Sequence, residues 1–457
     1  MASEPSLQDR AKAAFWPPCT HLADRDLWPP VEIVGASGSY LQLADGRRVV
    51  DGISSWGCKA LGHRHPDLLA ALTEQAGRFD HVIAAGTVNE PLVRLCERLV
   101  AVVGGRAATV FLAGDGSTGM EIALKMALQF QAQTGHPGRT RIACLENAYH
   151  GETVATLAVS DCALYRAPFA AWCFPGTVLT GAPYRSGPTD PAWLDAGREW
   201  PGIRAQLDAV AGELAAVVVE PVLQGAGGMR VYSPDLLTRL RAWCDAHGVL
   251  LIADEIAAGM GRCGAWLGSQ LAPNAGADLT VLSKGLTGGM LPLAATVVSR
   301  RVQEAFAGTW DSGRSFLHSN TYCGHALAVA VAHAALDALA PLLPDIQRRG
   351  EGLRARLAEV ARTTGALGPV RGVGFVAAAD LLAPDAIPSR LGQRICRAAL
   401  AHGAFLRPLG STLYLLPPLN ASDAELDALA ESLGRAVADV ARSAERQLGI
   451  GGAPSDD

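Results

Sequence analysis

FLAGDGSTGMEIALKMALQF, residues Phe111–Phe130, joins three patterns in one stretch. A short apolar run ends at Leu112, three glycines follow at 114, 116 and 119 in the spacing G-x-G-x-x-G, and a helical pattern begins at Met120. A strand, a glycine loop and a helix in this order predict a phosphate site, because backbone N–H groups at the start of a helix attract anions. The pattern fits two ligands: the pyrophosphate of a nicotinamide dinucleotide or the single phosphate of another cofactor.

Short apolar runs alternate with amphipathic helical patterns through the centre of the chain. The runs lack the every-second-residue alternation of a half-exposed strand, as expected for strands covered on both faces. Strands that alternate with helices predict an α/β fold with a mainly parallel sheet and right-handed crossovers. The predicted strands are Thr109–Leu112, Arg141–Leu145, Ala216–Val219, Val249–Ala253, Leu279–Leu282 and Ala294–Val298, and the helices include Met120–Gln133 and Pro234–His247.

The two ends of the chain differ from this centre. Residues Tyr40–Val50 predict a hairpin with an Asp-Gly turn. The C-terminal part predicts an α+β unit that forms a small domain (residues 1–65 and 331–457) beside a large domain (residues 66–330). The tail Gly451–Asp457 is expected to be disordered. The predicted C-terminal elements are helices Leu327–Leu339, Ile346–Thr363, Arg390–His402 and Ala421–Leu448 and strands Gly374–Ala379 and Thr412–Leu416.

The composition is that of a chain able to bury a large core. Of 457 residues, 49% are hydrophobic and 18% charged, with a formal net charge of −5. No basic run indicates nucleic acid or a membrane surface, and no apolar run reaches the length of a membrane span. None of the ten cysteines falls in a C-x-x-C pair or a zinc-ligand spacing, so no metal is expected. The N-terminus lacks a signal-peptide pattern, so a cytoplasmic location with reduced thiols is expected.

Polar or aromatic residues follow five of the predicted strands. Ligands of an open parallel sheet bind beyond the carboxyl ends of its strands, so these residues could converge on one crevice. One such ending would carry little weight, because solubility alone favours polar strand ends. The five endings are the glycine loop, Glu146–Gly151, Glu220–Gly225, Asp254-Glu255 and Ser283-Lys284-Gly285.

Asp254 and Lys284 are the most informative of these residues. Isolated charges at the edge of a dry site are costly, so the plainest interpretation is an ion pair. The functional interpretation is pyridoxal phosphate (PLP), which needs a lysine for a Schiff base and a carboxylate beside its pyridine nitrogen. The released amine could then move a proton on the substrate. Gly116 and Ser117, at the start of the helix, could hold the phosphate.

A nicotinamide-dependent oxidoreductase is the alternative from another class. An acidic residue that holds the ribose is expected about twenty residues after the glycine motif. Glu146 ends the next predicted strand but lies 27 residues after Gly119. This alternative also leaves Asp254 and Lys284 without a role. A PLP-dependent racemase, mutase or decarboxylase, and a non-catalytic relative of the same fold, are further alternatives.

Longer motifs around these residues resemble a known family. Ile252–Arg262 (IADEIAAGMGR) and Ser283–Gly289 (SKGLTGG) resemble the signature of class III PLP-dependent aminotransferases. The resemblance extends from about Trp16 to Pro418 and implies fold type I. It implies transfer of an amino group from a small-molecule donor to a ketone or aldehyde acceptor. Supporting motifs follow in order at Gly116-Ser117, Asn147–Gly151, Glu220-Pro221 and Thr321.

The resemblance implies a role for each matching residue. Lys284 forms the Schiff base, Asp254 pairs with the pyridine nitrogen, and Tyr149 stacks on the pyridine ring. Thr321 reaches the phosphate from the partner subunit, so the active form would be a homodimer with shared sites. Glu220 belongs to the shell around the cofactor or is the counter-charge of an arginine.

Within the family, the closest likeness is to the aminotransferase of biotin synthesis. That enzyme makes 7,8-diaminononanoate from 8-amino-7-oxononanoate, usually with S-adenosylmethionine as donor. The resemblance implies that Arg407 binds the carboxylate of the acceptor, with Trp56 and Tyr414 also at the substrate. The matching stretches are Asp51–Trp56, Val222–Met229, Leu286–Gly289 and Leu406–Gly410 with Tyr414.

Three positions depart from the biotin enzymes where the acceptor would bind. Cys19 replaces a tyrosine, Gly57 replaces an aromatic residue, and Ser319-Asn320 replace Gly-Pro. These changes predict a wider, more polar pocket than a long alkyl acceptor needs. They fit either drift in a divergent biotin enzyme or a relative recruited to another carbonyl acceptor in specialised metabolism.

Several other residues have a structural interpretation that outweighs a functional one. His63 and His65 lack a third ligand, so capping or solvated histidines are expected rather than a metal site. His150 either supports Tyr149 or packs in the core. Small apolar fillers are the expected role of three cysteines near the crevice, which are Cys58, Cys263 and Cys323.

Overall fold

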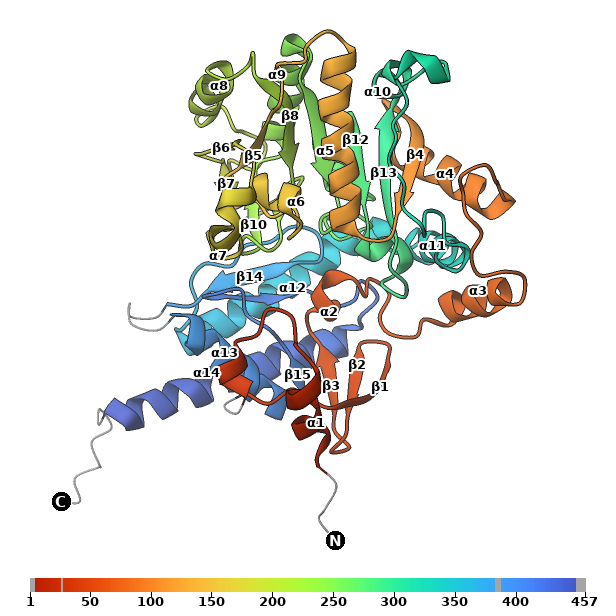
Figure 1. The fold of residues 1–457 in the computed structure, drawn as a ribbon. Helices are drawn as coiled ribbons and strands as arrows, with labels where there is room; N and C mark the ends of the chain where they lie inside the picture. The colour runs from red at the N-terminus through yellow and green to blue at the C-terminus, as the bar shows by residue number, and fades with distance from the viewer. Residues whose placement is uncertain (1–4, 26–27, 383–387, 449–457) are drawn as a thin grey trace, which may run out of the picture.

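The largest element of the protein is a twisted sheet in the upper half of Figure 1. The computed structural model describes residues 5–25, 28–382 and 388–448. Within these residues the sheet has seven strands in the order β4-β13-β12-β11-β8-β5-β6. The strands are β4 (Ala107–Ala113), β5 (Arg141–Leu145), β6 (Gly176–Leu179), β8 (Leu214–Val219), β11 (Leu250–Asp254), β12 (Leu279–Leu282) and β13 (Ala294–Ser299).

The sheet is mainly parallel, as predicted, but β13 runs antiparallel to both of its neighbours. The reason is the connection between β12 and β13. Fewer than a dozen residues join Leu282 to Ala294, which is too short for a crossover that would bring the chain back parallel. This connection carries Lys284. The strand β6 was not predicted from the sequence.

Successive residues of the central strands pack into two different cores. Ile252 of β11 belongs to a cluster with residues of α5 (Gly116–Gln133). Its neighbours Leu251 and Ala253 belong to a larger cluster on the other face. The sheet is therefore covered on both sides, which explains why its strands show no alternation. The larger cluster includes residues of α4 (Glu90–Val103), α9 (Asp235–His247) and α11 (Ala326–Leu339).

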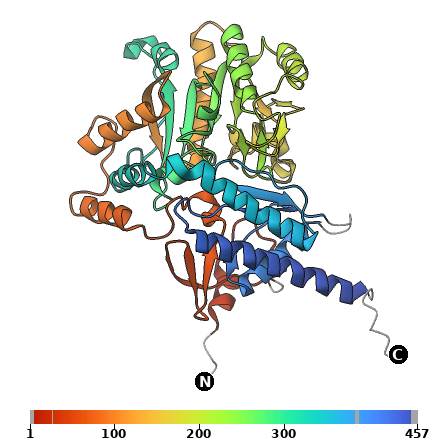
Figure 2. The ribbon, with the colours of Figure 1, turned by 180° about the vertical axis from the view of Figure 1, so that it is seen from behind.

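The two ends of the chain meet below this sheet (Figures 1 and 2). The predicted hairpin is confirmed as β2 (Tyr40–Leu43) and β3 (Arg48–Asp51). From the C-terminal part, β15 (Ala404–Phe405) adds to β3 in parallel, so one sheet contains both ends. This pairing supports a small domain made from both termini, and the boundaries at residues 65 and 330 stay predictions. The other elements of this region are β1 (Ile33–Ser37), β14 (Ala377–Asp380), β16 (Thr412–Leu415), α12 (Leu343–Thr364), α13 (Pro388–Ala401) and α14 (Asp423–Leu448).

Shorter elements complete the described chain. Three of them form a small sheet in the order β7-β10-β9. The tail Gly451–Asp457, expected to be disordered, lies outside the described residues. The short elements are α1 (Leu7–Ala14), α2 (Ser54–Gly57), α3 (Pro66–Ala76), α6 (Val154–Ala158), α7 (Ala163–Arg166), α8 (Trp200–Asp208), α10 (Arg300–Ala305), β7 (Tyr184–Arg185), β9 (Leu223–Gln224) and β10 (Arg230–Tyr232).

No single helix in the described ranges is long and apolar enough to cross a membrane. The pair α11 and α12, bent by 72° against each other, would reach the needed length and composition only together.

Close backbone contacts connect α12 through Gly374 to the loop after β11. A Cβ placed on Gly350 of α12 would lie 1.6 Å from the carbonyl oxygen of Gly374. Gly374 has φ +53°, and a Cβ there would lie 2.2 Å from the carbonyl oxygen of Arg262. The Arg262 guanidinium in turn donates to the carbonyl oxygens of Phe375 (3.2 Å) and Pro417 (2.8 Å). The positive φ at Gly374 also explains why β14 begins only at Ala377, later than predicted.

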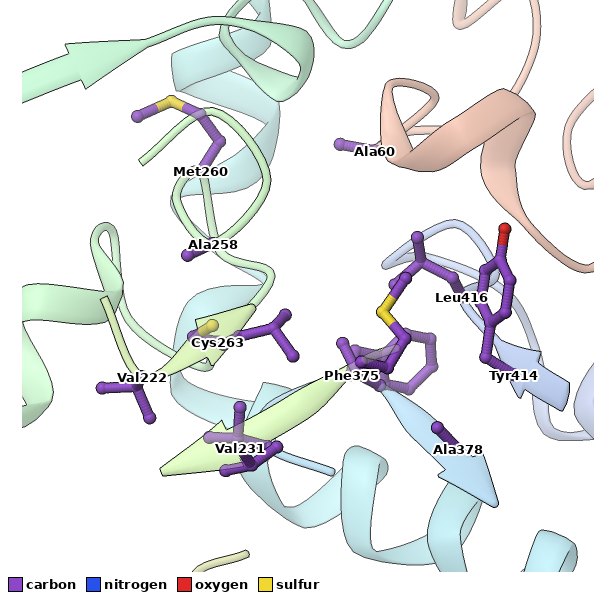
Figure 3. Close-up of a cluster of buried hydrophobic side chains, with 14 of the residues drawn as sticks. Ala60, Val222, Val231, Ala258, Met260, Cys263, Phe375, Ala378, Tyr414 and Leu416 are labelled. Atoms are coloured by element: carbon purple, nitrogen blue, oxygen red, sulfur yellow. The ribbon is translucent and has the colours of Figure 1, made fainter. Parts of the chain in front are cut away.

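Apolar side chains seal the same joint (Figure 3). Cys263, from the loop after β11, lies on the side of Phe375 in this view, whereas the Met260 side chain points away from it; Met260, Cys263, Phe375 and Leu416 all belong to the larger core. Met260 and Cys263 are buried, with 2% and 0% exposure. The chain segment that leaves Asp254 is therefore held between the two parts of the protein.

The contact at Gly350 predicts a large difference between two glycines of one helix. Gly350→Ala should destabilise the protein by about 3 kcal/mol, because the new Cβ collides with a backbone oxygen. Gly352→Ala is the matched control: its Cβ would meet only the end of the Arg356 side chain at 3.1 Å. Helix propensity favours alanine there by up to about 1 kcal/mol. Urea denaturation of both variants measures the difference, and equal stabilities would contradict the tight joint.

Candidate active site

A cavity of about 1580 Å³ opens at the carboxyl ends of the central strands. Its walls come from the main sheet and from both ends of the chain. Ser319, Asn320 and Thr321 do not line the cavity of their own chain. The other predicted site residues all do: Cys19, Trp56, Gly116, Ser117, Tyr149, Glu220, Asp254, Lys284, Arg407 and Tyr414.

Asp254 and Lys284 are brought together by the parallel pairing of β11 and β12. Asp254 ends β11 and pairs with Val281 of β12. Lys284 follows Val281 by three residues, just after the end of β12. Asp254 is buried at 3% exposure, while the Lys284 side chain opens into the cavity. Burial lowers the pKa of the Lys284 amine, and the negative charge of Asp254 opposes this shift. A lysine with a lowered pKa is a better nucleophile near neutral pH.

His150 holds the Asp254 carboxylate from behind. Its Nδ1 lies 2.7 Å from Asp254 Oδ2, and Asp254 Oδ1 accepts the N–H of Ile256 at 3.1 Å. Burial alone would lower the pKa of His150, but the hydrogen bond and charge of Asp254 raise it above its ordinary value. Its buried Nε2 has no partner among the described residues. His150 therefore supports Asp254 rather than merely filling the core.

Glu220 fastens two loops of the cavity. Its Oε2 accepts the N–H of Tyr149 at 3.0 Å, and its Oε1 accepts the N–H of Gly225 at 2.9 Å. Burial raises the pKa of Glu220 to about 7, while the positive charge of His150 acts against the shift. Glu220 thus fixes the backbone of the loop that presents Tyr149.

The glycine loop lines the cavity with Asp115, Gly116 and Ser117. Asp115 caps α5 by accepting the N–H of Thr118 at 3.0 Å, so the helix begins at Gly116, four residues before its predicted start. A Cβ on Gly116 would lie 2.8 Å from Ile256. The space beside Gly116 is therefore a cradle that a larger residue would fill. N–H groups in the first turn of a helix have no partner within the helix and can bind a phosphate.

The third glycine of the motif has a packing role. A Cβ on Gly119 would lie 2.9 Å from Val281 Cγ1 and 3.2 Å from Ala294. Gly119 therefore lets α5 approach β12 and β13 closely. The three-glycine spacing combines a phosphate cradle with a helix contact, which explains why it matches a dinucleotide motif.

Tyr149 lies on one wall of the cavity. Its hydroxyl donates to Glu152 Oε1 at 2.9 Å, and its ring meets the ring of Tyr165 edge-on with centroids 5.9 Å apart. Burial raises the pKa of Tyr149, and the hydrogen bond to Glu152 raises it further, so the phenol stays protonated. Sequence reasoning did not single out Tyr165 or Glu152, because neither lies in a distinctive motif.

Trp56 projects from a left-handed turn. Residues Ser54–Gly57 have φ values of 48°, 47°, 64° and 76°. This conformation costs about 1–2 kcal/mol for each residue other than glycine, so it persists only where other contacts impose it. Trp56 is 45% exposed and lines the cavity. The turn itself favours glycine at Gly57, where a Cβ would also lie 3.0 Å from Leu416 Cδ2.

Asp51 supplies the contacts that hold this turn. Its fully buried carboxylate accepts the N–H of Ile53 at 3.3 Å, the N–H of Ser55 at 3.1 Å and the Ser55 hydroxyl at 2.8 Å. His63 Nε2 completes the set at 3.0 Å. His63 thus supports a turn, and its neighbour His65 lies 4.0 Å from Asp67 instead. The described residues contain no group of three potential ligands that could hold a metal ion.

Arg407 lies against the indole of Trp56. The guanidinium carbon is 5.1 Å from the ring centroid, and Nη2 donates to the carbonyl oxygen of Cys19 at 2.8 Å. Cys19 has φ +47° and is exposed in the cavity. Tyr414 is almost wholly buried at 3% exposure and packs beside Leu416 (Figure 3), so only an edge of it reaches the cavity.

The segment with Ser319, Asn320 and Thr321 is attached to α5 and does not line the cavity. His318 Nδ1 is 2.9 Å from the Lys125 amine, which fixes the start of the segment to the helix. Ser319 and Thr321 are exposed. The Asn320 Oδ1 lies 4.0 Å from a Cβ built on Gly114 of the glycine loop.

Comparison with known proteins decides the family. The model of the family described as Aminotransferase class-III matches residues 23–437.

The chain belongs to the class-III aminotransferase family.

Relatives agree with this assignment over nearly the full length. The adenosylmethionine-8-amino-7-oxononanoate aminotransferase of Synechococcus elongatus is 38% identical over 90% of this chain and 95% of its own. The enzyme of the same name from Geobacter sulfurreducens is 34% identical over 94% and 97%. A PLP-bound amine transaminase from an uncultivated Pseudomonas species matches with a TM-score of 0.86 at 32% identity, over 93% of this chain and 99% of its own. The fold is therefore fold type I, and the nicotinamide alternative is set aside.

The enzyme is a PLP-dependent aminotransferase that resembles 7,8-diaminononanoate synthase. The cavity fits this cofactor, because it combines a lysine, a buried carboxylate and a glycine cradle at a helix start. Bound PLP withdraws electrons from the substrate carbon that carries the amino group. Asp254 could keep the pyridine nitrogen protonated, His150 holds that carboxylate in place, and the Lys284 amine could carry the proton between two carbon atoms.

The site predicts where the cofactor attaches. The chain has four lysines, at 12, 59, 125 and 284, so a covalent label can be located without ambiguity. Borohydride reduction of the PLP-loaded protein should fix a pyridoxyl group to Lys284 alone, as read by peptide mass spectrometry. Lys284→Ala should abolish the label and lower transamination at least about a thousandfold. The control Lys59→Ala should keep both, and a label on any other lysine would contradict the assignment.

Proposed function

We propose that this aminotransferase acts on a carbonyl acceptor that carries a carboxylate, of the kind represented by 8-amino-7-oxononanoate. The observation that carries this proposal is the position of Arg407 in the same cavity as Lys284. Among the described residues its guanidinium makes one hydrogen bond, to Cys19. Most of its five N–H donors remain for a ligand, and a guanidinium suits the two oxygens of a carboxylate.

The proposal also assigns the contacts with the cofactor to individual residues. Lys284 would hold the cofactor covalently, Asp254 would pair with the ring nitrogen, and Tyr149 would cover the ring. Gly116 and Ser117 would bind the phosphate through the first turn of α5. The common position of these residues along one cavity supports the assignment.

The names of the relatives support a proposal for the amino donor as well as for the carbonyl acceptor. The proteins from Synechococcus elongatus and Geobacter sulfurreducens are named for adenosylmethionine and 8-amino-7-oxononanoate. We infer that the amino donor is S-adenosylmethionine or another amino acid. A cytoplasmic location and the absence of nucleic-acid and membrane partners stay predictions.

A second candidate is a different, bulkier carbonyl acceptor. Cys19 and Gly57 stand where the biotin enzymes carry aromatic side chains, and both line the cavity. A volume of about 1580 Å³ exceeds the range of roughly 300–1,000 Å³ that is usual for small-molecule sites. The room for PLP is included in this volume, yet space remains for a large acceptor.

Arg407→Ala tests the proposed acceptor class. In a spectrophotometric assay with 8-amino-7-oxononanoate, kcat/KM of the variant should fall about 10- to 100-fold, the loss expected for a charged hydrogen bond. With hexanal, which has no carboxylate, the change should stay within about threefold. Failure of the wild-type enzyme to use 8-amino-7-oxononanoate would favour the second candidate. An equal loss with both acceptors would contradict carboxylate binding by Arg407.

We propose further that the active form is a homodimer with shared sites. The segment around Thr321 supports this, because it is anchored to α5 by Gln129 and Gln133 as well as by Lys125. The segment is anchored, yet Ser319, Asn320 and Thr321 do not line the cavity of their own chain. The exposed apolar residues Leu317 (77%) and Tyr322 (59%) on either side offer a face for a second copy.

Mixed dimers test this arrangement. Thr321→Ala alone should weaken PLP binding about tenfold through loss of a phosphate contact. A heterodimer of Thr321→Ala and Lys284→Ala subunits would contain one intact site, because the Lys284→Ala subunit still supplies Thr321 to its partner. The intact site should bind PLP with wild-type affinity, and the activity per heterodimer should reach about half that of the wild-type dimer. If Thr321 served its own subunit, the heterodimer would retain the defect of Thr321→Ala.

A further inference from the structure

The chain makes a sharp corner at Asn147, between β5 and the residues proposed to face the cofactor. Asn147 has φ +60°, in the left-handed region that is unfavourable for residues other than glycine. Its carbonyl oxygen lies against Gly227, where a Cβ would come within 2.1 Å of that oxygen. Tyr149 and His150 follow directly after the corner. The direction of both side chains therefore depends on the conformation of Asn147.

The backbone N–H groups at this corner are held by carboxylates from other parts of the chain. The Asn147 N–H donates to Asp161 Oδ2 at 2.9 Å, and the Tyr149 N–H donates to Glu220 Oε2 at 3.0 Å. These two bonds fix the backbone on either side of the corner, but neither of them involves the Asn147 side chain.

The Tyr184 hydroxyl holds the Asn147 side chain. Asn147 Nδ2 donates to this hydroxyl at 2.8 Å. The hydroxyl lies 2.8 Å from Gln224 Oε1 and 3.2 Å from the Glu146 carbonyl oxygen, and either of these can accept its proton. Gln224 Nε2 donates to the same carbonyl oxygen at 2.8 Å. The first residue of β7, the last residue of β9 and the residue after β5 thus meet at one hydroxyl group.

Tyr184 itself stands behind the wall of the cavity. Asn147 and Arg230 line the cavity, whereas Tyr184 does not. The guanidinium carbon of Arg230 lies 5.4 Å from the centroid of the Tyr184 ring. Burial raises the pKa of Tyr184 to about 12, so the phenol keeps its proton at neutral pH. Tyr184 can therefore act on a ligand only through the residues that it holds.

We propose that Tyr184 is a positioning residue for the cofactor end of the cavity. Its hydroxyl holds Asn147 in the left-handed conformation, and this conformation directs Tyr149 toward the cofactor ring and His150 toward Asp254. The inference rests on the proposed function, in which Tyr149 covers the ring of the cofactor.

Tyr184→Phe tests the inference, because it removes the hydroxyl and keeps the ring. The affinity for PLP should fall about three- to tenfold, the loss expected for one neutral hydrogen bond. The circular-dichroism band of bound PLP should change as well, because the ring of Tyr149 shifts relative to the cofactor. Equilibrium dialysis and circular dichroism of the full-length holoenzyme measure the two effects. The control Tyr40→Phe should change neither, because that ring also lies beneath a guanidinium, the one of Arg48, but does not line the cavity.

A glycine at position 147 shows whether Tyr184 acts through the corner. Glycine adopts this φ without strain, so Asn147→Gly should keep the PLP affinity within about threefold of the wild type. In that background the corner no longer needs the hydroxyl, and adding Tyr184→Phe should change the affinity less than about twofold. An equal effect of Tyr184→Phe in both backgrounds would overturn the inference, because the two residues would then act independently.

Thermal unfolding separates positioning from general stability. A variant that is merely less stable remains folded at the assay temperature and binds PLP with unchanged affinity. A lowered Tm of Tyr184→Phe, with unchanged PLP affinity and an unchanged dichroism band, would show a structural role only and contradict the proposal.

Tyr149→Ala distinguishes this inference from the proposed function. It should weaken PLP binding and change the same dichroism band. If it changes neither, the proposed role of Tyr149 fails, and the effect of Tyr184→Phe then reports the position of His150 alone. If Tyr149→Ala changes both and Tyr184→Phe changes neither, the proposed function is supported and only the role of Tyr184 is wrong.

Discussion

The parallel pairing of β11 and β12 is the constraint on which the site depends. It brings a carboxylate and an amine to the same edge of a sheet that is covered on both faces. Charges at such an edge need partners close by, because water cannot solvate them fully. Asp254 meets this need with His150 and a backbone N–H. The Lys284 amine remains open to the cavity, so the arrangement that stabilises the acid also leaves a reactive base.

Buried carboxylates hold the loops around this edge. The loops cannot use the hydrogen-bond ladders of a helix or sheet, yet their backbone N–H groups still require acceptors. Asp51 accepts two of them beneath Trp56, and Glu220 accepts two beneath Tyr149 and Gly225. Glu255 accepts two more, from the residues at 268 and 269. Asp51 and Glu220 thus fix backbone next to residues that line the cavity, and Glu255 does the same for a loop outside it, which explains why these acids are buried.

Sequence reasoning succeeded where a signal is local and failed where it is not. The central strands and the pair Asp254 and Lys284 could be predicted, because apolar runs without alternation mark strands covered on both faces and charges directly after them are unusual. The direction of β13 depends on how the chain returns, which its composition does not record. The ring contact between Tyr149 and Tyr165 depends on two segments folding onto each other, so no pattern around Tyr165 predicts it. The left-handed turn at Trp56 likewise depends on contacts of Asp51. The motif Asp51–Trp56 indicated a functional stretch, but it did not predict the conformation of the turn.

The two ends of the cavity have different origins, and this has a consequence for function. The groups proposed to act on the cofactor come from the strand ends of the main sheet and from the segments that follow them. The groups that face the acceptor come from separate segments: Cys19 and Trp56 from the N-terminal part, and Arg407 from the C-terminal part. A substitution at Cys19 or Gly57 changes the wall without disturbing the strand ends that carry Asp254 and Lys284. One chemistry can therefore be kept while the acceptor changes, and a family likeness fixes the reaction more firmly than it fixes the substrate.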